Sequence, residues 1–354
     1  MTLDELKRTI RQGMPLMKVD FSGMPFINED LEGAIFLECQ FNNCDFSRAN
    51  LKRVVFTQCQ LNHAVFDDAW LDQASAVECV MHRTHFQGAI NTLTICHSDL
   101  SASQWHQVAL DTVTLTGCDL SQAVLTSAEI HTSTFADCQT QELRLDTVKL
   151  FNTTWTQADF RDVTVIASEF NQVLLLESQF ADNDFSHMVF SRCTCVKSQF
   201  VACQFKQSQL IESNFSQCQL VSCDFTEANM HSALLIEATI KETCFDATQL
   251  ENANFQDAQM HNSRFANSQL THAWMKGLTA ENTQFSHADL SGASLIHAVL
   301  NQCSFKQALL VRALVHGMQA SHCDWSGANR KDVITTEPKQ AQLEEKLQQR
   351  GISI

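Results

Sequence analysis

Cysteine and histidine are the residues of this sequence that could most readily hold a metal ion or act as nucleophiles. The 354 residues include 15 Cys and 14 His. Zinc sites commonly draw on closely spaced pairs such as C-x-x-C, and no such pair occurs here. Cys39 and Cys44 are too far apart for this motif, and Cys193 and Cys195 are too close. We therefore expect no metal site, and we interpret the cysteines as small, apolar core residues.

Other arrangements that support catalysis are also missing from the sequence. We find no Ser/His/Asp set, no glycine-rich phosphate loop and no paired-carboxylate motif. The histidines, except His85, follow a large apolar residue by one or two positions, where we expect them to face outward. A repetitive chain without long insertions also lacks the loops that build a concave pocket. We expect no catalytic residue, no cofactor and no enzymatic activity.

Charge and hydropathy narrow the possible partners. The chain has 40 Asp and Glu against 24 Lys and Arg, a net charge of −16. Direct binding of nucleic acid needs a basic surface, so we expect none. No apolar run approaches the ~18 residues of a membrane span, and the first residues, Met1 to Glu5, have no apolar signal core. We expect a cytoplasmic protein with reduced thiols and no membrane contact.

The elements that position these side chains follow from a repeat of five residues. Large apolar residues recur at every fifth position from Phe21 to Phe86, one residue is then missing, and the series continues from Ile90 to Trp325. Of the 24 Phe, only Phe151 lies outside this phase. Small residues, including most of the cysteines, stand two positions before each large residue. This period fits neither a helix nor a simple strand, but a chain that turns a corner in every repeat.

The repeat resembles the pentapeptide-repeat family over residues 21–329. Matching units are Ala49-Asn50-Leu51, Ala158-Asp159-Phe160 and Ala288-Asp289-Leu290-Ser291-Gly292. The resemblance implies an all-β fold, a right-handed quadrilateral parallel β-helix with four repeats per coil. The chain would then form about 15 coils, roughly 75 Å long at ~4.8 Å per coil. Residues 20 apart would stack in columns.

The two ends of the chain differ from the repeat, which gives three segments. Residues 1–18 are predicted to form an N-terminal capping helix, because Thr2 and Glu5 have the spacing of a capping box. Residues 19–329 form the β-helix, and residues 330–354 a C-terminal linker and helix. Leu343 and Leu347 make a narrow apolar stripe on that helix. The stripe would either cap the last coil or pair with a second copy, giving a homodimer.

Stacking of residues 20 apart also predicts a surface for a protein partner. Acidic residues gather in neighbouring columns, and outward apolar residues adjoin them. The predicted partner-binding residues are Asp137, Glu142, Asp162, Glu177, Asp182, Leu176, Val196, Val201 and Val221. The acids either serve only solubility or form a ridge for a basic protein, and the apolar residues are either ordinary exposed side chains or a docking patch.

These features lead to two functional hypotheses. The first is a non-enzymatic interaction scaffold or adaptor. The helix-then-repeat start, with Leu3, Leu6, Ile10 and Gly13 before Phe21, is similar to pentapeptide-repeat proteins associated with bacterial type VI secretion, which implies a role in effector loading. The alternative is an acidic DNA mimic that binds DNA gyrase or topoisomerase, similar in style to fluoroquinolone-resistance proteins. Duplex DNA of ~75 Å carries ~44 charges, whereas this chain has a net charge of −16.

Overall fold

The fold is a parallel β-solenoid of about 15 turns, seen in a computed structural model. The structure describes residues 1–335, 342, 344, 346 and 347. They fall into two compact units, residues 1–183 and residues 184–354, which we describe in turn. Each turn takes 20 residues, so that Phe36 pairs with Phe56 and Phe200 with Leu220. No helix among the described residues is long and apolar enough to cross a membrane.

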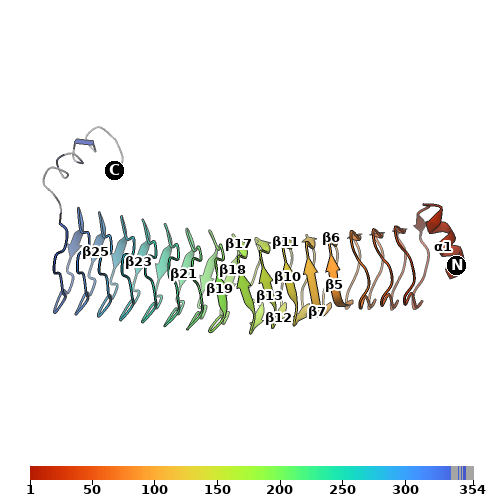
Figure 1. Ribbon diagram of the computed structural model, residues 1–354, viewed down its shortest axis with the longest axis horizontal. Coiled ribbons are helices and arrows are strands. Elements are labelled where there is room, and N and C mark those ends of the chain that lie inside the picture. Colours follow the sequence, from red (N-terminus) through yellow and green to blue (C-terminus); the bar gives the residue numbers. More distant parts are fainter. Residues whose placement is uncertain (336–341, 343, 345, 348–354) are drawn as a thin grey trace. The chain divides into compact units, whose positions relative to one another are not determined.

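Unit 1 begins with the helix that the capping box predicts, α1 (Leu3–Arg11). The backbone amide of Glu5 donates to Thr2 Oγ1, and the amide of Thr2 donates to the Glu5 carboxylate, so two otherwise unpaired donors of the first turn are satisfied. Leu6 is completely buried, and Lys7 pairs with Glu29 of the solenoid. Figure 1 shows α1 beside the first turns of this unit. The helix therefore packs on the solenoid through one apolar side chain and one ion pair.

Short parallel strands line the sides of unit 1, with one residue of each strand pointing inward. One sheet runs in the order β1 (Leu16–Met17), β2 (Ile35–Leu37), β3 (Val55–Thr57), β4 (Ser75–Val77), β6 (Thr94–Cys96), β8 (Thr114–Thr116), β11 (Thr134–Ala136), β14 (Thr154–Thr156) and β17 (Leu174–Leu176). A second runs in the order β15 (Thr164–Ile166), β12 (Arg144–Asp146), β9 (Val124–Thr126), β7 (Gln104–Asp111), β10 (Glu129–His131), β13 (Lys149–Phe151) and β16 (Glu169–Asn171), and β5 (His85–Asn91) also pairs with β7. The last strand of the unit is β18 (Gln179–Ala181).

The missing residue of the repeat is absorbed near Gly88, as the sequence predicts. The pairing of β5 with β7 shifts register between Phe86 and Gly88. Gly88 has φ +91°, and a Cβ placed on it would lie 2.7 Å from the Asp68 Oδ1 atom, so this site requires glycine. The two strands that pair through this corner, β5 and β7, are longer than the other strands among the described residues. Trp105 then stacks on Phe86 with ring centroids 3.9 Å apart.

Unit 2 continues the same design with one ladder of short strands. It contains β19 (Val189–Ser191), β20 (Gln199–Val201), β21 (Gln219–Val221), β22 (Thr239–Lys241), β23 (Gln259–His261), β24 (Thr279–Glu281), β25 (Val299–Asn301) and β26 (Gln319–Ser321). Strands β20 to β26 pair in chain order, as Figure 1 shows for this unit. The other sides are held by single parallel bridges, such as Asp224 with Cys244.

The core consists of stacked columns of the large residues. In unit 2, Phe225, Phe245 and Phe265 are completely buried, with ring centroids 4.8 and 4.7 Å apart and nearly parallel rings. The small residues two positions earlier are buried beside them, as Cys218 and Ala228 show. Packing of this density leaves no room for larger side chains at the small positions. Toward the C-terminus the columns lose their cover, since Ala320 is exposed and Trp325 only half-buried.

Candidate functional site

The predicted acidic residues lie at the corners of the solenoid. We define the corner position as the second residue after each buried large residue. It usually adopts a left-handed backbone, and φ is 53° at Asp137, 58° at Glu142, 53° at Glu177 and 58° at Asp182. This conformation points the side chain away from the core at the place where the chain changes direction. Asp162 occupies the same position in the repeat, and all five carboxylates are exposed.

These five residues of unit 1, which we call the corner ladder, form two columns on either side of one face. Asp137, Gln157 and Glu177 make one column, because Thr134, Thr154 and Leu174 are paired in register. Glu142, Asp162 and Asp182 make the other, because Arg144 pairs with Thr164 and Asp159 with Gln179. The face between them carries mostly polar residues, from segments 139–141 and 159–161 and from strand β18.

Few contacts neutralise the corner ladder. Glu142 Oε2 accepts a hydrogen bond from Gln122 Nε2 at 3.0 Å. Arg161 lies on the face between the columns, and its Nε atom donates to Asp159 Oδ1 at 2.8 Å. Its interaction with Asp162 is electrostatic, without a hydrogen bond. Like charges on neighbouring strands of a sheet repel one another. The second column therefore stacks carboxylates on successive turns at a cost in stability that a cationic partner would relieve.

Other acidic residues stabilise the backbone of the corners through hydrogen bonds, which the residues of the corner ladder do not. Asp99, Asp119 and Asp184 stand directly before a buried residue, and each accepts a hydrogen bond from the backbone amide two positions later, at 2.8, 2.8 and 2.9 Å. Such Asx turns help to set the corner. Asp159 has a similar role, and its side-chain hydrogen bonds with Arg161 hold the pKa of this carboxyl below its usual value. The acidic surface thus divides into acids that build corners and acids that do not.

The predicted apolar residues lie in both units and are described separately. In unit 1, Leu176 is half-buried at the end of β17, directly before Glu177. In unit 2, Val201 is 42% exposed and pairs in register with Val221, as the stacking rule predicts, while Val196 is half-buried. The valine column ends at Lys241, which pairs with Val221 on the next strand of unit 2. Leu176 is therefore the apolar neighbour of the corner ladder within unit 1.

Sequence reasoning did not select three exposed apolar residues on the strands of unit 1 near the corner ladder. Phe151 is 41% exposed on β13, with its ring centroid 5.8 Å from that of His131. Ile166 and Leu174 are also exposed. The signal for Phe151 was present in the sequence, because it is the phenylalanine outside the five-residue phase. Leu174 shares β17 with Leu176, so the apolar edge beside Glu177 is larger than predicted.

The predicted C-terminal stripe is described only in part. Leu343 lies outside the described residues, and Leu347 is half-buried. The choice between capping the last coil and pairing with a second copy therefore stays open, and homodimerisation stays a prediction.

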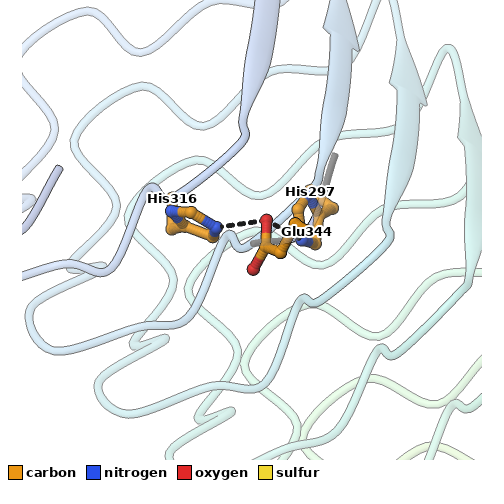
Figure 2. Close-up of side chains that lie close together, drawn as sticks. All are labelled: His297, His316 and Glu344. Carbon is orange, nitrogen blue, oxygen red and sulfur yellow. Dashed lines mark hydrogen bonds and ion pairs between the residues drawn. The ribbon is translucent and has the colours of Figure 1, made fainter. Parts of the chain in front are cut away.

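A cluster of two histidines and one glutamate in unit 2 also escaped the sequence analysis. His316 Nε2 lies 2.7 Å from Glu344 Oε2, and His297 Nε2 lies 3.7 Å from the same oxygen (Figure 2). We expected all histidines at outward positions to be exposed, and this is wrong for His316, which is 7% exposed. Its position in the repeat is an outward one, but Glu344 covers it. The three residues are 19 and 28 positions apart, so no short motif connects them.

The thiols belong to the core. The 15 cysteines are present as thiols, and Cys39, Cys59 and Cys79, which follow one another at intervals of 20 residues, are buried. Burial raises the pKa of the Cys218 thiol to about 12. Cys118 differs, since a hydrogen bond with the Cys138 thiol lowers the pKa of Cys118 although the residue is buried. The arrangement fits the interpretation of the cysteines as small core residues.

Comparison with protein families agrees with this geometry. A model described as "Pentapeptide repeat region" matches residues 198–275. A second, described as "Pentapeptide repeats (8 copies)", matches residues 16–58 and 281–317. The chain is a pentapeptide repeat protein. Its 20-residue turns, with a buried large residue in every fifth position, are the structural form of that repeat.

Two solved structures are similar to this chain at low sequence identity. HetL from the cyanobacterium Nostoc sp. strain PCC 7120, described as involved in heterocyst differentiation regulation, is 16% identical, with a TM-score of 0.36 over 68% of this chain and 86% of that one. QnrB1, a plasmid-mediated fluoroquinolone resistance protein, is 15% identical, with a TM-score of 0.24 over 56% of this chain and 99% of that one. No curated protein sequence matches this pentapeptide repeat protein.

Proposed function

We propose that this pentapeptide repeat protein is a non-enzymatic scaffold that binds a basic protein partner in the cytoplasm through the corner ladder. The observation that carries the proposal is the separation of the acidic residues into two groups. Asp99, Asp119 and Asp159 are used to build corners, whereas the ladder carboxylates are exposed at corners that form without their side chains. Leu174 and Leu176 add an apolar edge to the same unit.

Rigid presentation favours binding at such a ladder. Many corners are fixed by backbone hydrogen bonds to the next turn, as in the donation from the Gln122 amide to the carbonyl oxygen of Gln141, the residue directly before Glu142, at 2.8 Å. A carboxylate on a backbone that is fixed beside it, as at Glu142, loses little backbone entropy when a partner binds. Their charge accelerates the encounter with a basic surface, and the leucine edge contributes contact area after docking.

The charge density argues against the alternative of a DNA mimic. Duplex DNA has one charge per ~1.7 Å, so a turn of ~4.8 Å would need about three charges. The corner ladder offers at most two negative charges per turn, from Asp137 and Glu142 in one turn and from Glu177 and Asp182 in another. The turn between these two also carries the positive charge of Arg161. We therefore favour a protein with a compact basic patch over an enzyme whose site fits duplex DNA.

A more specific setting is an accessory role in type VI secretion, in which the scaffold presents an effector or spike protein for loading. Its support is the resemblance of the N-terminal start, where helix α1 with Leu6 precedes the first repeat at Phe21. Co-purification of an effector or spike component from a bacterium with this secretion system would support the setting. Inhibition of DNA supercoiling by gyrase would instead favour the DNA mimic.

Affinity capture tests the proposal. Full-length protein is immobilised and exposed to a bacterial lysate, as wild type and as the variant Glu142→Lys, Asp162→Lys, Asp182→Lys. The control variant, Glu227→Lys, Glu237→Lys, Glu242→Lys, makes the same change in charge at exposed corner positions of unit 2. We expect the first variant to lose its captured protein, most clearly at low salt, and the control to keep it. Equal capture by all three proteins would refute a role for the ladder.

A further inference from the structure

We propose that His297, His316 and Glu344 bind a divalent d-block metal ion, of which zinc fits best, and that the ion clamps the segment around Glu344 to two successive turns of unit 2. One donor atom from each residue lies within 4.8 Å of the other two. Two imidazoles and a carboxylate are a common zinc donor set, whereas calcium and magnesium prefer oxygen donors. This inference does not depend on the protein-binding role proposed above.

Two of the three distances between the donors lie near the value for a tetrahedral ion, and the histidine nitrogens lie within 4.8 Å of each other. Ligand bonds of ~2.0–2.1 Å in a tetrahedron place the donor atoms about 3.3 Å apart. Glu344 Oε2 is 2.7 Å from His316 Nε2 and 3.7 Å from His297 Nε2, so the two distances lie on either side of this value. Metal entry would lengthen the first by about 0.6 Å and shorten the second by about 0.4 Å. Small rotations of the Glu344 side chain, drawn between the two rings in Figure 2, can supply these two changes, and rotation of the imidazole rings sets the distance between the two histidine nitrogens.

The solenoid fixes the two histidines next to each other. The amide of His297 donates to the carbonyl oxygen of His316 at 2.8 Å, which joins the two turns at this position. The ring of His297 then lies over Gly317, the corner residue of the following turn. A Cβ on Gly317 would lie 2.2 Å from His297 Nδ1, so glycine leaves the space that the ring occupies. The ring centroids of His297 and His316 are 5.2 Å apart.

Burial favours a metal ligand at this place. The side chain of Glu344 is 15% exposed and that of His316 is 9% exposed. Taking a carboxylate out of water is costly unless a positive charge compensates it. The Nδ1 atom of His316 is buried and has no hydrogen-bond partner among the described residues, whereas its Nε2 atom lies 2.7 Å from Glu344 Oε2, so Nε2 is the atom that would bind the ion.

The three ligands leave a fourth position on the ion, which we assign to water. His297 is the most exposed of the three, with 31% of its side chain accessible, so water can reach the ion from that side. The ion would connect residues that are far apart in the sequence through bonds stronger than the hydrogen bond between His316 and Glu344. The expected consequence is that the metal holds the segment around Glu344 on the solenoid.

Cobalt titration of the metal-stripped, full-length protein tests this site. Co²⁺ is the probe because its visible absorption reports ligand type, and thiolate ligands add a charge-transfer band that histidine and carboxylate do not. This separates the proposed site from the cysteines. We expect one Co²⁺ per chain without the thiolate band, and displacement by Zn²⁺. The variants His316→Gln and Glu344→Gln should weaken binding on the order of 100-fold, and Gly317→Ala about tenfold by displacing the His297 ring.

A matched control is available in the same unit. His272 lies over Gly292 in the same way as His297 lies over Gly317, with a Cβ-to-Nδ1 distance of 2.6 Å, but it belongs to no three-residue donor cluster of the described residues. His272→Gln should leave Co²⁺ binding unchanged. As a second readout, Zn²⁺ should slow tryptic cleavage after Lys346 in the wild type but not in Glu344→Gln. Absence of stoichiometric Co²⁺ binding, a thiolate band, or equal binding by His316→Gln would overturn the proposal.

Discussion

Replacement of Phe245 by alanine tests the packing on which every surface feature depends. Phe245 is completely buried, and its ring is stacked between Phe225 at 4.8 Å and Phe265 at 4.7 Å. Burial of an aromatic side chain removes ~150–250 Å² from water, which at ~25 cal/mol/Å² contributes roughly 4–6 kcal/mol. Alanine keeps part of this, and the cavity adds a penalty. We expect Phe245→Ala to lower the free energy of unfolding by about 3–5 kcal/mol.

The place of the loss is as informative as its size. Each turn of a solenoid contacts only its neighbours, so the destabilisation should be local. Hydrogen exchange read residue by residue should show faster exchange around Phe225, Phe245 and Phe265 and unchanged exchange in β2 and β3 of unit 1. Phe151→Ala, at an exposed position, is the control and should change stability by no more than about 0.5 kcal/mol. A loss below about 1 kcal/mol for Phe245→Ala, or a uniform rise in exchange across both units, would refute the stacked-column account.

Two further predictions concern titratable groups. Burial raises the thiol pKa of Cys218 to about 12, so Cys218 should react with a thiol reagent at pH 8 only after denaturation. The half-exposed Cys323 is the control and should react in the native protein. Rapid labelling of Cys218 in the native protein would contradict its burial. The side chain and backbone of Ser186 hydrogen-bond to Asp184 and lower the pKa of its carboxyl. The stability that Asp184 adds to the folded state is therefore fully present above the unfolded pKa of about 3.9, and it is lost as the pH falls through the lower folded pKa. Asp184→Asn should therefore reduce acid destabilisation between pH 5 and 2 by a few tenths of a kcal/mol in urea unfolding, and an unchanged pH profile would contradict this.

The fold could be predicted because the same five residues specify the same local structure in every repeat. The large residue of each repeat packs in the core over the residue 20 positions earlier. The slip at Gly88 was visible in the sequence as one residue missing from the series. The consequence of the slip was not predictable. Residues 104–111 keep the five-residue phase, and Gln107 keeps the left-handed corner conformation, but they form one long strand, β7, because they pair along their length with β5, where one residue is missing. Pairing with a neighbouring turn overrides the local pattern at this point.

The candidate sites were less predictable, because outward side chains are not constrained by the repeat. The columns of Asp137 and Glu142 follow from the period of 20, but sequence alone did not distinguish these acids from Asp119, which caps a turn through Ser121. His316 was misjudged for a different reason. Its position in the repeat faces outward, and its burial comes from Glu344, which lies outside the repeat. A contact between a repeat residue, such as His316, and a residue outside the repeat, such as Glu344, cannot be predicted from the five-residue period.

Carboxylate footprinting measures most directly whether the corner ladder binds a partner. The protein is labelled with a carbodiimide and an amine, free and in complex with its captured partner, and each modified residue is quantified by mass spectrometry. We predict that binding strongly reduces the modification of Glu142, Asp162 and Asp182, and also of Asp137 and Glu177, because these exposed carboxylates become covered. Glu227, Glu237 and Glu242 of unit 2 should be modified to the same extent in both states. Unchanged modification of the ladder in a complex that is demonstrably formed would show that the partner binds elsewhere and would contradict the proposed function.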